Sequence, residues 1–252
     1  MPQIKETLQD KVYRITLCRP PLNVMDIAML EELGQACRRA VDSDASIILL
    51  TGEGKAFSSG VDVGDHDEAK VKQASQLFSK VFEILRETDK PIFAAVNGYA
   101  LGGGCELAMA ADIIVASEKA KFGQPEIGVG AVASIACYCL FKRVSRSHAF
   151  ELLLSGKHIT AQRAYEMGLV NEVLPLEGFA EAVDGYIAQY TALSPLLLAK
   201  TKKAALAAEG KGWDEGIAII EDIYEREVTP SHDAKEGIAA FLEKRKPVWT
   251  GE

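Results

Sequence analysis

The sequence predicts an α/β fold with a largely parallel sheet, followed by a helical region. Two observations predict this class: strand-length apolar runs alternate with amphipathic helical patterns in the first half, and only helical patterns follow residue 140 or so. The chain has 252 residues, of which 48% are hydrophobic and 25% are charged. This composition is typical of a globular protein with one main domain and an appendage.

The alternation begins near the N-terminus. Residues 11–18 alternate as a strand does, and residues 26–43 carry apolar side chains at helical spacing behind Asp26, a candidate N-cap. Residues 46–54 form a short apolar run closed by glycine, which is typical of a buried strand. The pattern continues with a helix at 68–88, a strand at 90–98, a helix at 103–110 and a strand at 112–118. Strands joined by helices in this order imply right-handed crossovers and mostly parallel pairing.

Helical patterns alone fill the second half of the chain. They are the segments SHAFELLLSG, TAQRAYEMGL, EGFAEAVDGYIAQYTAL, SPLLLAKTKKAALAAEG and WDEGIAIIEDIYEREVT. We therefore expect an α/β core over residues 1–190 and a C-terminal helical region over residues 191–252.

Charge and cysteine content exclude several classes of protein. The net charge of −8 argues against a nucleic-acid groove, which needs clustered Lys and Arg. The five cysteines are odd in number, and Cys137 and Cys139 are too close for a zinc site, so we expect reduced thiols and no metal. The N-terminus lacks the apolar region of a signal peptide, and no apolar run approaches the roughly 18 residues of a membrane span. These features indicate a cytoplasmic protein without a membrane partner.

Three consecutive glycines, residues 102–104, stand between a predicted strand and a predicted helix. Bare backbone at a helix start exposes N–H groups to an anion, but the Gly-Lys-Ser/Thr and GxGxxG motifs of phosphate loops are absent. A second small-residue turn at 57–63 follows an earlier strand, and parallel pairing can bring both turns together. Two converging N–H groups suit one oxygen, as in an oxyanion hole. The alternative for each turn is plain close packing.

Two acids accompany these turns. Glu106 lies in the first turn of an apolar helix, and Glu126 follows the strand 112–118. A carboxyl in apolar surroundings has a raised pKa and can carry a proton at neutral pH, so this pair could place a water molecule and move its protons. The alternatives are a helix-dipole acid for Glu106 and a solvated loop residue for Glu126.

Residues 97–130, NGYALGGGCELAMAADIIVASEKAKFGQPEIGVG, strongly resemble the signature of the crotonase (enoyl-CoA hydratase/isomerase) superfamily. Further blocks of resemblance cover nearly the whole chain, at residues 15–26, 54–63, 152–175 and 241–252. The resemblance implies a spiral of ββα turns followed by helices, assembled as a homotrimer or a dimer of trimers. It also implies an acyl-CoA substrate, with coenzyme A as part of the substrate and no separate cofactor.

The resemblance assigns roles to the two turns and the two acids. The N–H groups of Val61 and Gly103 would hold the thioester oxygen as it becomes an enolate. Glu106 would help to activate water, and Glu126 would supply the proton to carbon. Retention of both acids favours a hydratase. An isomerase or decarboxylase of the same fold and a non-catalytic CoA-binding subunit are the alternatives.

Two segments depart from the usual family pattern, residues 128–144 and 60–73. Both resemble the cyclohexa-1,5-diene-1-carbonyl-CoA hydratases of anaerobic aromatic degradation. The small residues Ala131, Ala133 and Ser134 could leave room for a ring, although different core packing would account for them equally well.

The resemblance also implies contacts beyond the catalytic groups. Expected to contact the acyl part of the substrate are Ser59, Asp62, Val63, His66, Ala131 and Val132. Expected to contact coenzyme A are Arg19, Leu22, Val24, Lys55, Ser58 and Lys244. Taken singly, the charged residues among them could equally be solvated surface groups. We interpret Cys105 as a small packing residue, because no histidine partner for a nucleophilic thiol is evident.

Overall fold

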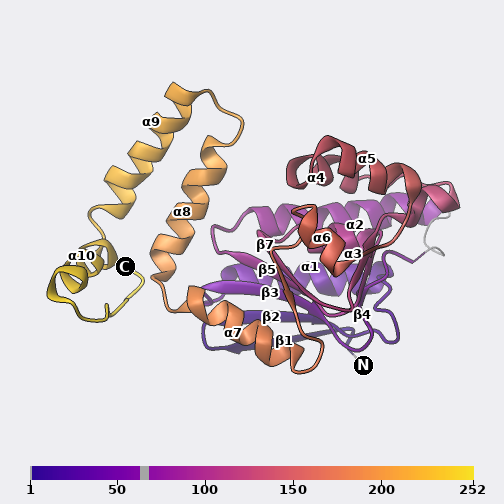
Figure 1. The fold of residues 1–252 in the computed structure, drawn as a ribbon, viewed down its shortest axis with the longest axis horizontal. Helices are drawn as coiled ribbons and strands as arrows, with labels where there is room; N and C mark the ends of the chain where they lie inside the picture. Colours follow the sequence, from indigo (N-terminus) through magenta and orange to yellow (C-terminus); the bar gives the residue numbers. More distant parts are fainter. Residues whose placement is uncertain (1, 63–67) are drawn as a thin grey trace. The chain divides into compact units, whose positions relative to one another are not determined.

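A computed structural model describes residues 2–62 and 68–252, which fall into two compact units (Figure 1). The first unit comprises Met1–Thr88 with Ile92–Tyr186, and the second comprises Asp89–Pro91 with Ile187–Glu252. The first unit contains both sheets, whereas the second is built of helices. Helix α7 (Phe179–Thr191) runs from the first unit into the second.

A six-stranded sheet forms the centre of the first unit, in the order β1-β2-β3-β5-β7-β10. Its strands are β1 (Ile4–Gln9), β2 (Val12–Leu17), β3 (Ile47–Gly52), β5 (Ile92–Val96), β7 (Ile113–Ser117) and β10 (Glu172–Leu174). All neighbours pair in parallel except β1 and β2, which confirms the predicted α/β class. Strand β1 was not predicted, because only Ile4 of its six residues is buried and its sequence reads as a charged terminus.

A second sheet consists of very short strands in the order β4-β6-β8-β9. Its strands are β4 (Ala56–Ser58), β6 (Tyr99–Leu101), β8 (Lys121–Gly123) and β9 (Ile159–Thr160). Strands β4, β6 and β8 pair in parallel, and β9 is antiparallel to β8. The sequence did not predict this sheet, because two or three residues are too few to show an alternating pattern.

Helices connect the strands of the first unit. They are α1 (Ile27–Asp42), α2 (Glu68–Arg86), α3 (Gly103–Ala108), α4 (Ala136–Arg143), α5 (Arg146–Ser155), α6 (Ala161–Glu166) and the 3-10 helix η2 (Pro125–Val129). Asp26 caps α1 as predicted, with its carboxylate accepting the N–H of Met29 at 2.9 Å. The other helices predicted in this unit are confirmed to within a few residues at their ends, and α4 and η2 were not predicted.

The core of the first unit explains why its central strands read as continuous apolar runs. Ile48, Leu50, Ala94, Val96 and Ile114 are fully buried in β3, β5 and β7. A parallel strand covered on both faces has no solvated side to mark with polar residues. Figure 1 shows α1 and α2 beside this sheet, and the two helices pack against each other. Among the described helices, none has the length and apolar character needed to cross a membrane.

The second unit consists of α8 (Pro195–Ala208), α9 (Trp213–Ile223), the π-helical turn η3 (Tyr224–Val228) and α10 (His232–Glu243). Helices α8 and α9 lie side by side as a hairpin (Figure 1).

The carboxylate of Asp233 fixes the C-terminal tail within this unit. Asp233 is fully buried and accepts hydrogen bonds from the Ser194 hydroxyl at 2.5 Å, the Thr250 N–H at 2.8 Å and the Gly251 N–H at 3.1 Å. Burial alone raises the pKa of Asp233, but the hydrogen bonds it accepts outweigh burial and lower the pKa to about 2.

Asp233→Asn tests this clamp. At pH 7 the free energy of unfolding should fall by about 1–3 kcal/mol, because the donors around residue 233 lose a charged acceptor. The folded pKa is lowered from 3.8 to about 2. The stabilisation by the wild-type carboxylate is therefore present above the unfolded pKa and lost as pH falls toward the folded one. Urea denaturation at several pH values measures both effects, with the exposed Asp214→Asn as control. Equal stability of the two variants would contradict the clamp.

Candidate functional site

Three adjacent parallel strands of the small sheet bring the predicted site residues together. Strand β4 leads into the loop that contains Val61, β6 leads into Gly103 and Glu106 of α3, and β8 leads into Glu126 of η2. The carboxyl ends of neighbouring parallel strands meet at one edge, so these four residues line one pocket. The predicted convergence of the two turns is confirmed, although the short second sheet produces it.

The N–H groups of Val61 and Gly103 are close to each other. A Cβ atom built on Gly103 would lie 3.3 Å from the Val61 nitrogen, and one built on Gly60 would lie 3.4 Å from the Gly103 nitrogen. Among the described residues, no acceptor takes the N–H of Val61 or of Gly103. Both residues line the pocket. Two neighbouring, uncommitted donors are what an oxyanion hole requires.

The glycine run allows this closeness through contacts that no side chain would permit. A Cβ atom on Gly104 would lie 2.0 Å from the carbonyl oxygen of Ser58, far closer than a carbon–oxygen van der Waals contact allows. A Cβ atom on Gly102 would lie 2.5 Å from Oε1 of Glu126, and Gly102 has a φ of +52°. Bare backbone therefore serves two purposes: it lets α3 approach β4, and it leaves room for the Glu126 carboxylate.

Glu106 is a buried carboxyl held by backbone donors. Its side chain is 5% exposed, and Oε1 accepts the N–H of Ala136 at 2.7 Å. Burial raises the pKa of Glu106 from 4.5 to about 7, the N–H groups of Ala136 and Ile135 oppose this rise, and the charge of Glu126 adds to it. At neutral pH, Glu106 therefore exists in both protonation states and can accept or release a proton.

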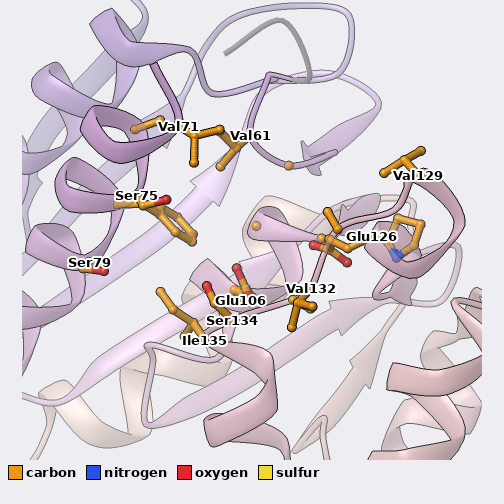
Figure 2. A pocket seen from close by; sticks show the side chains of 18 of the residues that line it. Val61, Val71, Ser75, Ser79, Glu106, Glu126, Val129, Val132, Ser134 and Ile135 are labelled. Carbon is orange, nitrogen blue, oxygen red and sulfur yellow. The ribbon is translucent and has the colours of Figure 1, made fainter. Parts of the chain in front are cut away.

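The pocket has a volume of about 580 Å³ and is bounded by two elements besides the strand ends. Helix α2 contributes Val71, Ala74, Ser75, Phe78 and Ser79, and the segment 129–135 forms the remaining wall. Figure 2 shows Glu106 and Glu126 on one side of the pocket, with Ser75 and Ser79 across from them. Of the described lining residues, all except Glu106 and Glu126 are uncharged. The pocket therefore suits a largely apolar group placed next to two carboxyls.

Three of the six expected acyl contacts line the pocket. Ser59, Ala131 and Val132 are among its lining residues. Asp62 follows Val61 but is not among them, and its carboxylate lies 3.8 Å from the guanidinium of Arg19. Val63 and His66 lie outside the described residues, so their expected contacts stay predictions.

The expected coenzyme A contacts are not gathered at the described pocket. Arg19 donates to the carbonyl oxygen of Val24 at 2.7 Å and pairs with Asp26 at 2.8 Å. Leu22, Val24 and Lys55 are partly or fully exposed but do not line the pocket, and Lys244 ends α10 in the second unit. These contacts stay predictions.

The prediction for Ser58 is wrong. Ser58 is fully buried, and its hydroxyl donates to the carbonyl oxygen of Asn23 at 2.7 Å and accepts the N–H of Gly60 at 3.1 Å. A buried hydroxyl with both partners in place has no surface to offer to coenzyme A.

Sequence reasoning missed the contribution of α2 and the backbone partner of Glu106. Phe78, Ser75 and Ser79 reach the pocket because α2 passes over it, and Ala136 reaches Glu106 from the start of α4. The sequence signal that α2 lines the pocket is the small polar pair Ser75 and Ser79, one turn apart on an otherwise amphipathic helix. Cys105 is buried, and burial raises the pKa of its thiol to about 12, as expected of a packing residue. No cluster of metal ligands occurs among the described residues.

Comparisons with known proteins extend over almost the entire chain. A family model described as "Enoyl-CoA hydratase/isomerase" matches residues 7–252. A probable mitochondrial enoyl-CoA hydratase of Dictyostelium discoideum is 38% identical over 244 residues, covering 95% of this chain and 87% of that protein. A cyclohexa-1,5-dienecarbonyl-CoA hydratase of Thauera aromatica is 35% identical over 242 residues, covering 94% of this chain and 92% of that protein.

The fold agrees equally well with solved structures. The crystal structure of an enoyl-CoA hydratase from Bacillus anthracis superposes with a TM-score of 0.94 at 29% identity. The match covers 99% of this chain and 100% of that one.

The raised pKa of Glu106 can be measured directly. In carboxyl ¹³C NMR, one glutamate resonance should titrate near pH 7 and disappear in Glu106→Gln. Glu126→Gln should shift this midpoint downward, because it removes a neighbouring negative charge that raises the pKa of Glu106. The exposed Glu177→Gln should leave the midpoint unchanged. A Glu106 resonance that titrates near 4.5, like an exposed glutamate, would contradict the site geometry.

Proposed function

Because this chain belongs to the enoyl-CoA hydratase/isomerase family, we propose that it adds water to a cyclic, conjugated dienoyl-CoA. Family membership confirms the resemblance found in the sequence and the crotonase-type fold. The protein is an enzyme, a hydro-lyase of the enoyl-CoA hydratase type that acts on acyl-CoA. The cyclic acyl group is the finer proposal.

One observation supports hydration most directly: two uncommitted N–H groups stand beside two carboxyls, one of which has a pKa of about 7. In the proposed reaction, the thioester oxygen accepts the N–H groups of Val61 and Gly103. Glu106 takes a proton from water, and the water oxygen forms a bond to the electrophilic carbon of the conjugated system. The electron pair moves to the thioester oxygen as a dienolate. Glu126 then supplies the proton that returns the dienolate to a neutral product.

The pKa of Glu106, about 7, suits its proposed role as the general base. A general base works best when its pKa lies near the working pH, because it is then both available and strong enough. Oε1 of Glu126 occupies the space that a Cβ atom on Gly102 would need, so this glycine leaves room for the carboxyl beside the pocket. An isomerase only moves a proton between carbons and needs one acid, so a pair of acids supports hydration over isomerisation or decarboxylation.

The proposal of a cyclic acyl group rests on the wall formed by residues 129–135. Ala131, Ala133 and Ser134 carry small side chains there, and a pocket volume of about 580 Å³ exceeds that of a six-membered ring. The Thauera aromatica relative, whose name specifies a cyclic dienoyl-CoA, matches this chain at 35% identity. A role in aromatic degradation, a cytoplasmic location and a homotrimer or hexamer formed through the C-terminal helices belong to the same proposal.

Turnover in ¹⁸O-labelled water tests hydration. A hydratase should place one labelled oxygen in the product, whereas an isomerase or decarboxylase should place none. Glu126→Gln should lower kcat by about 10²–10⁴-fold with little change in substrate binding, because the amide cannot deliver the proton. An unlabelled product would contradict hydration. Undiminished turnover in Glu126→Gln would favour a different proton donor, and no turnover of any acyl-CoA by the wild type would favour a non-catalytic CoA-binding subunit.

A substrate screen tests the cyclic acyl group. Cyclohexa-1,5-diene-1-carbonyl-CoA should have a kcat/KM at least about tenfold above that of crotonyl-CoA, because a ring buries more apolar surface in this pocket. Ala131→Leu should reduce turnover of the cyclic substrate more than that of crotonyl-CoA, since the added side chain occupies the space proposed for the ring. Equal kcat/KM values for the two substrates would contradict the cyclic acyl group but would not affect the proposal of hydration.

A further inference from the structure

The loop that carries Val61 is fastened along its length to residues 22–25. The N–H of Ser59 donates to the carbonyl oxygen of Leu22 at 3.0 Å. The N–H of Met25 donates to the carbonyl oxygen of Gly60, and the N–H of Asp62 donates to that of Met25, both at 2.9 Å. Residues 22–25 therefore form a short parallel partner to the loop, with Met25 and Val61 as an isolated bridge.

This pairing determines where the N–H of Val61 points. In a trans peptide, the carbonyl and the following N–H point in opposite directions. Because the carbonyl of Gly60 is directed at Met25, the N–H of Val61 is directed away from residues 22–25. It therefore faces the side on which the Gly103 nitrogen and the pocket lie.

Ser58 fixes the preceding peptide. Its fully buried hydroxyl accepts the N–H of Gly60 at 3.1 Å and donates to the carbonyl oxygen of Asn23 at 2.7 Å. Besides the backbone hydrogen bonds, the Ser58 hydroxyl therefore links residues 22–25 to the loop through hydrogen bonds between side chain and backbone. None of the chemical steps described above uses this hydroxyl.

The acceptor of Ser58 is itself immobilised. The side-chain amide of Asn23 is fully buried and donates to the carbonyl oxygen of Ala56, at the start of β4, at 2.7 Å and to that of Glu53, directly after β3, at 3.0 Å. The Asn23 carbonyl therefore has a fixed position. It holds the Ser58 hydroxyl, which in turn holds the N–H of Gly60.

We propose that Ser58 is a positioning residue of the oxyanion site: its buried hydroxyl holds the peptide before Gly60 so that the Val61 N–H stays aligned with that of Gly103. This role rests on the proposed function, because alignment matters only if both N–H groups bind one thioester oxygen. Without the hydroxyl, the Gly60 N–H loses its acceptor and the 59–60 peptide gains freedom to rotate. The Val61 donor then spends less time in line with the reacting oxygen.

The test compares Ser58→Ala with Ser58→Cys and the matched control Ser117→Ala. Ser117 is also fully buried, and its hydroxyl accepts the N–H two residues further on, that of Lys119, at 3.3 Å. Both alanine variants therefore remove a side-chain acceptor of the N–H two residues further on. Ser58→Ala also removes the donor to Asn23, and only Ser58 lies beside Val61. Ser58→Cys keeps a weak donor and acceptor of similar size, so it covers the case in which Ser58→Ala does not fold.

We expect Ser58→Ala to lower kcat about tenfold with KM within about threefold, since the loss falls on the transition state. The red shift in absorbance of a bound dienoyl-CoA, which reports polarisation of its carbonyl, should shrink in parallel. Ser58→Cys should recover part of both losses. Ser117→Ala should show a comparable fall in Tm with unchanged kcat and red shift.

Two outcomes would overturn the positioning role. One is an active wild type beside a Ser58→Ala variant with unchanged kcat and red shift. The other is an equal loss of kcat in Ser58→Ala and Ser117→Ala, which would mean that general destabilisation causes the effect. A wild-type protein that neither hydrates an enoyl-CoA nor shifts its absorbance would contradict the proposed function as well, and this result differs from both of the others.

Discussion

The close approach of α3 to the end of β4 is the constraint on which the rest of the site depends. The carbonyl oxygen of Ser58 occupies the place that a Cβ atom of residue 104 would take, at 2.0 Å. Only glycine permits this contact, which lets the start of α3 place the nitrogen of Gly103 beside that of Val61. Both N–H groups stay without an acceptor among the described residues, because the backbone carbonyls nearby are directed elsewhere.

Once these donors are placed, the chemistry of the carboxyls follows from their surroundings. Glu106 is buried on an apolar helix, so its charged form is disfavoured and its pKa rises to about 7. The N–H of Ala136 limits this rise, and it comes from the start of α4, directly after the pocket-lining Ile135. The pocket wall and the acid meet at Ile135, which lines the pocket and whose N–H lowers the pKa of Glu106.

The two sheets have different roles: the six-stranded sheet stabilises the first unit, and the small sheet positions the site. The six-stranded sheet buries the long apolar strands and forms the core of the first unit. The strands β4, β6 and β8 contain only three residues each, but their parallel pairing aligns the three chain segments that carry the donors and the acids. Short strands suffice here because their ends, and not their faces, position the site.

The sequence by itself determined the elements that neighbouring residues encode. The periodicity of residues 26–43 and 68–88 indicated α1 and α2, and the glycine run with Glu106 and Glu126 indicated the site through a family motif. Local patterns and short motifs are recorded in neighbouring residues, so no knowledge of the fold was needed to find them.

Only the tertiary structure decided how distant segments meet. The three-residue strands have no readable period, and nothing in the sequence joins Ser58 to Asn23, Phe78 to Gly103, or Ala136 to Glu106. These pairs lie apart in the chain and come together through backbone hydrogen bonds and burial, which depend on the whole fold. For this reason Ser58, expected at the surface beside coenzyme A, is instead a fully buried link behind Val61.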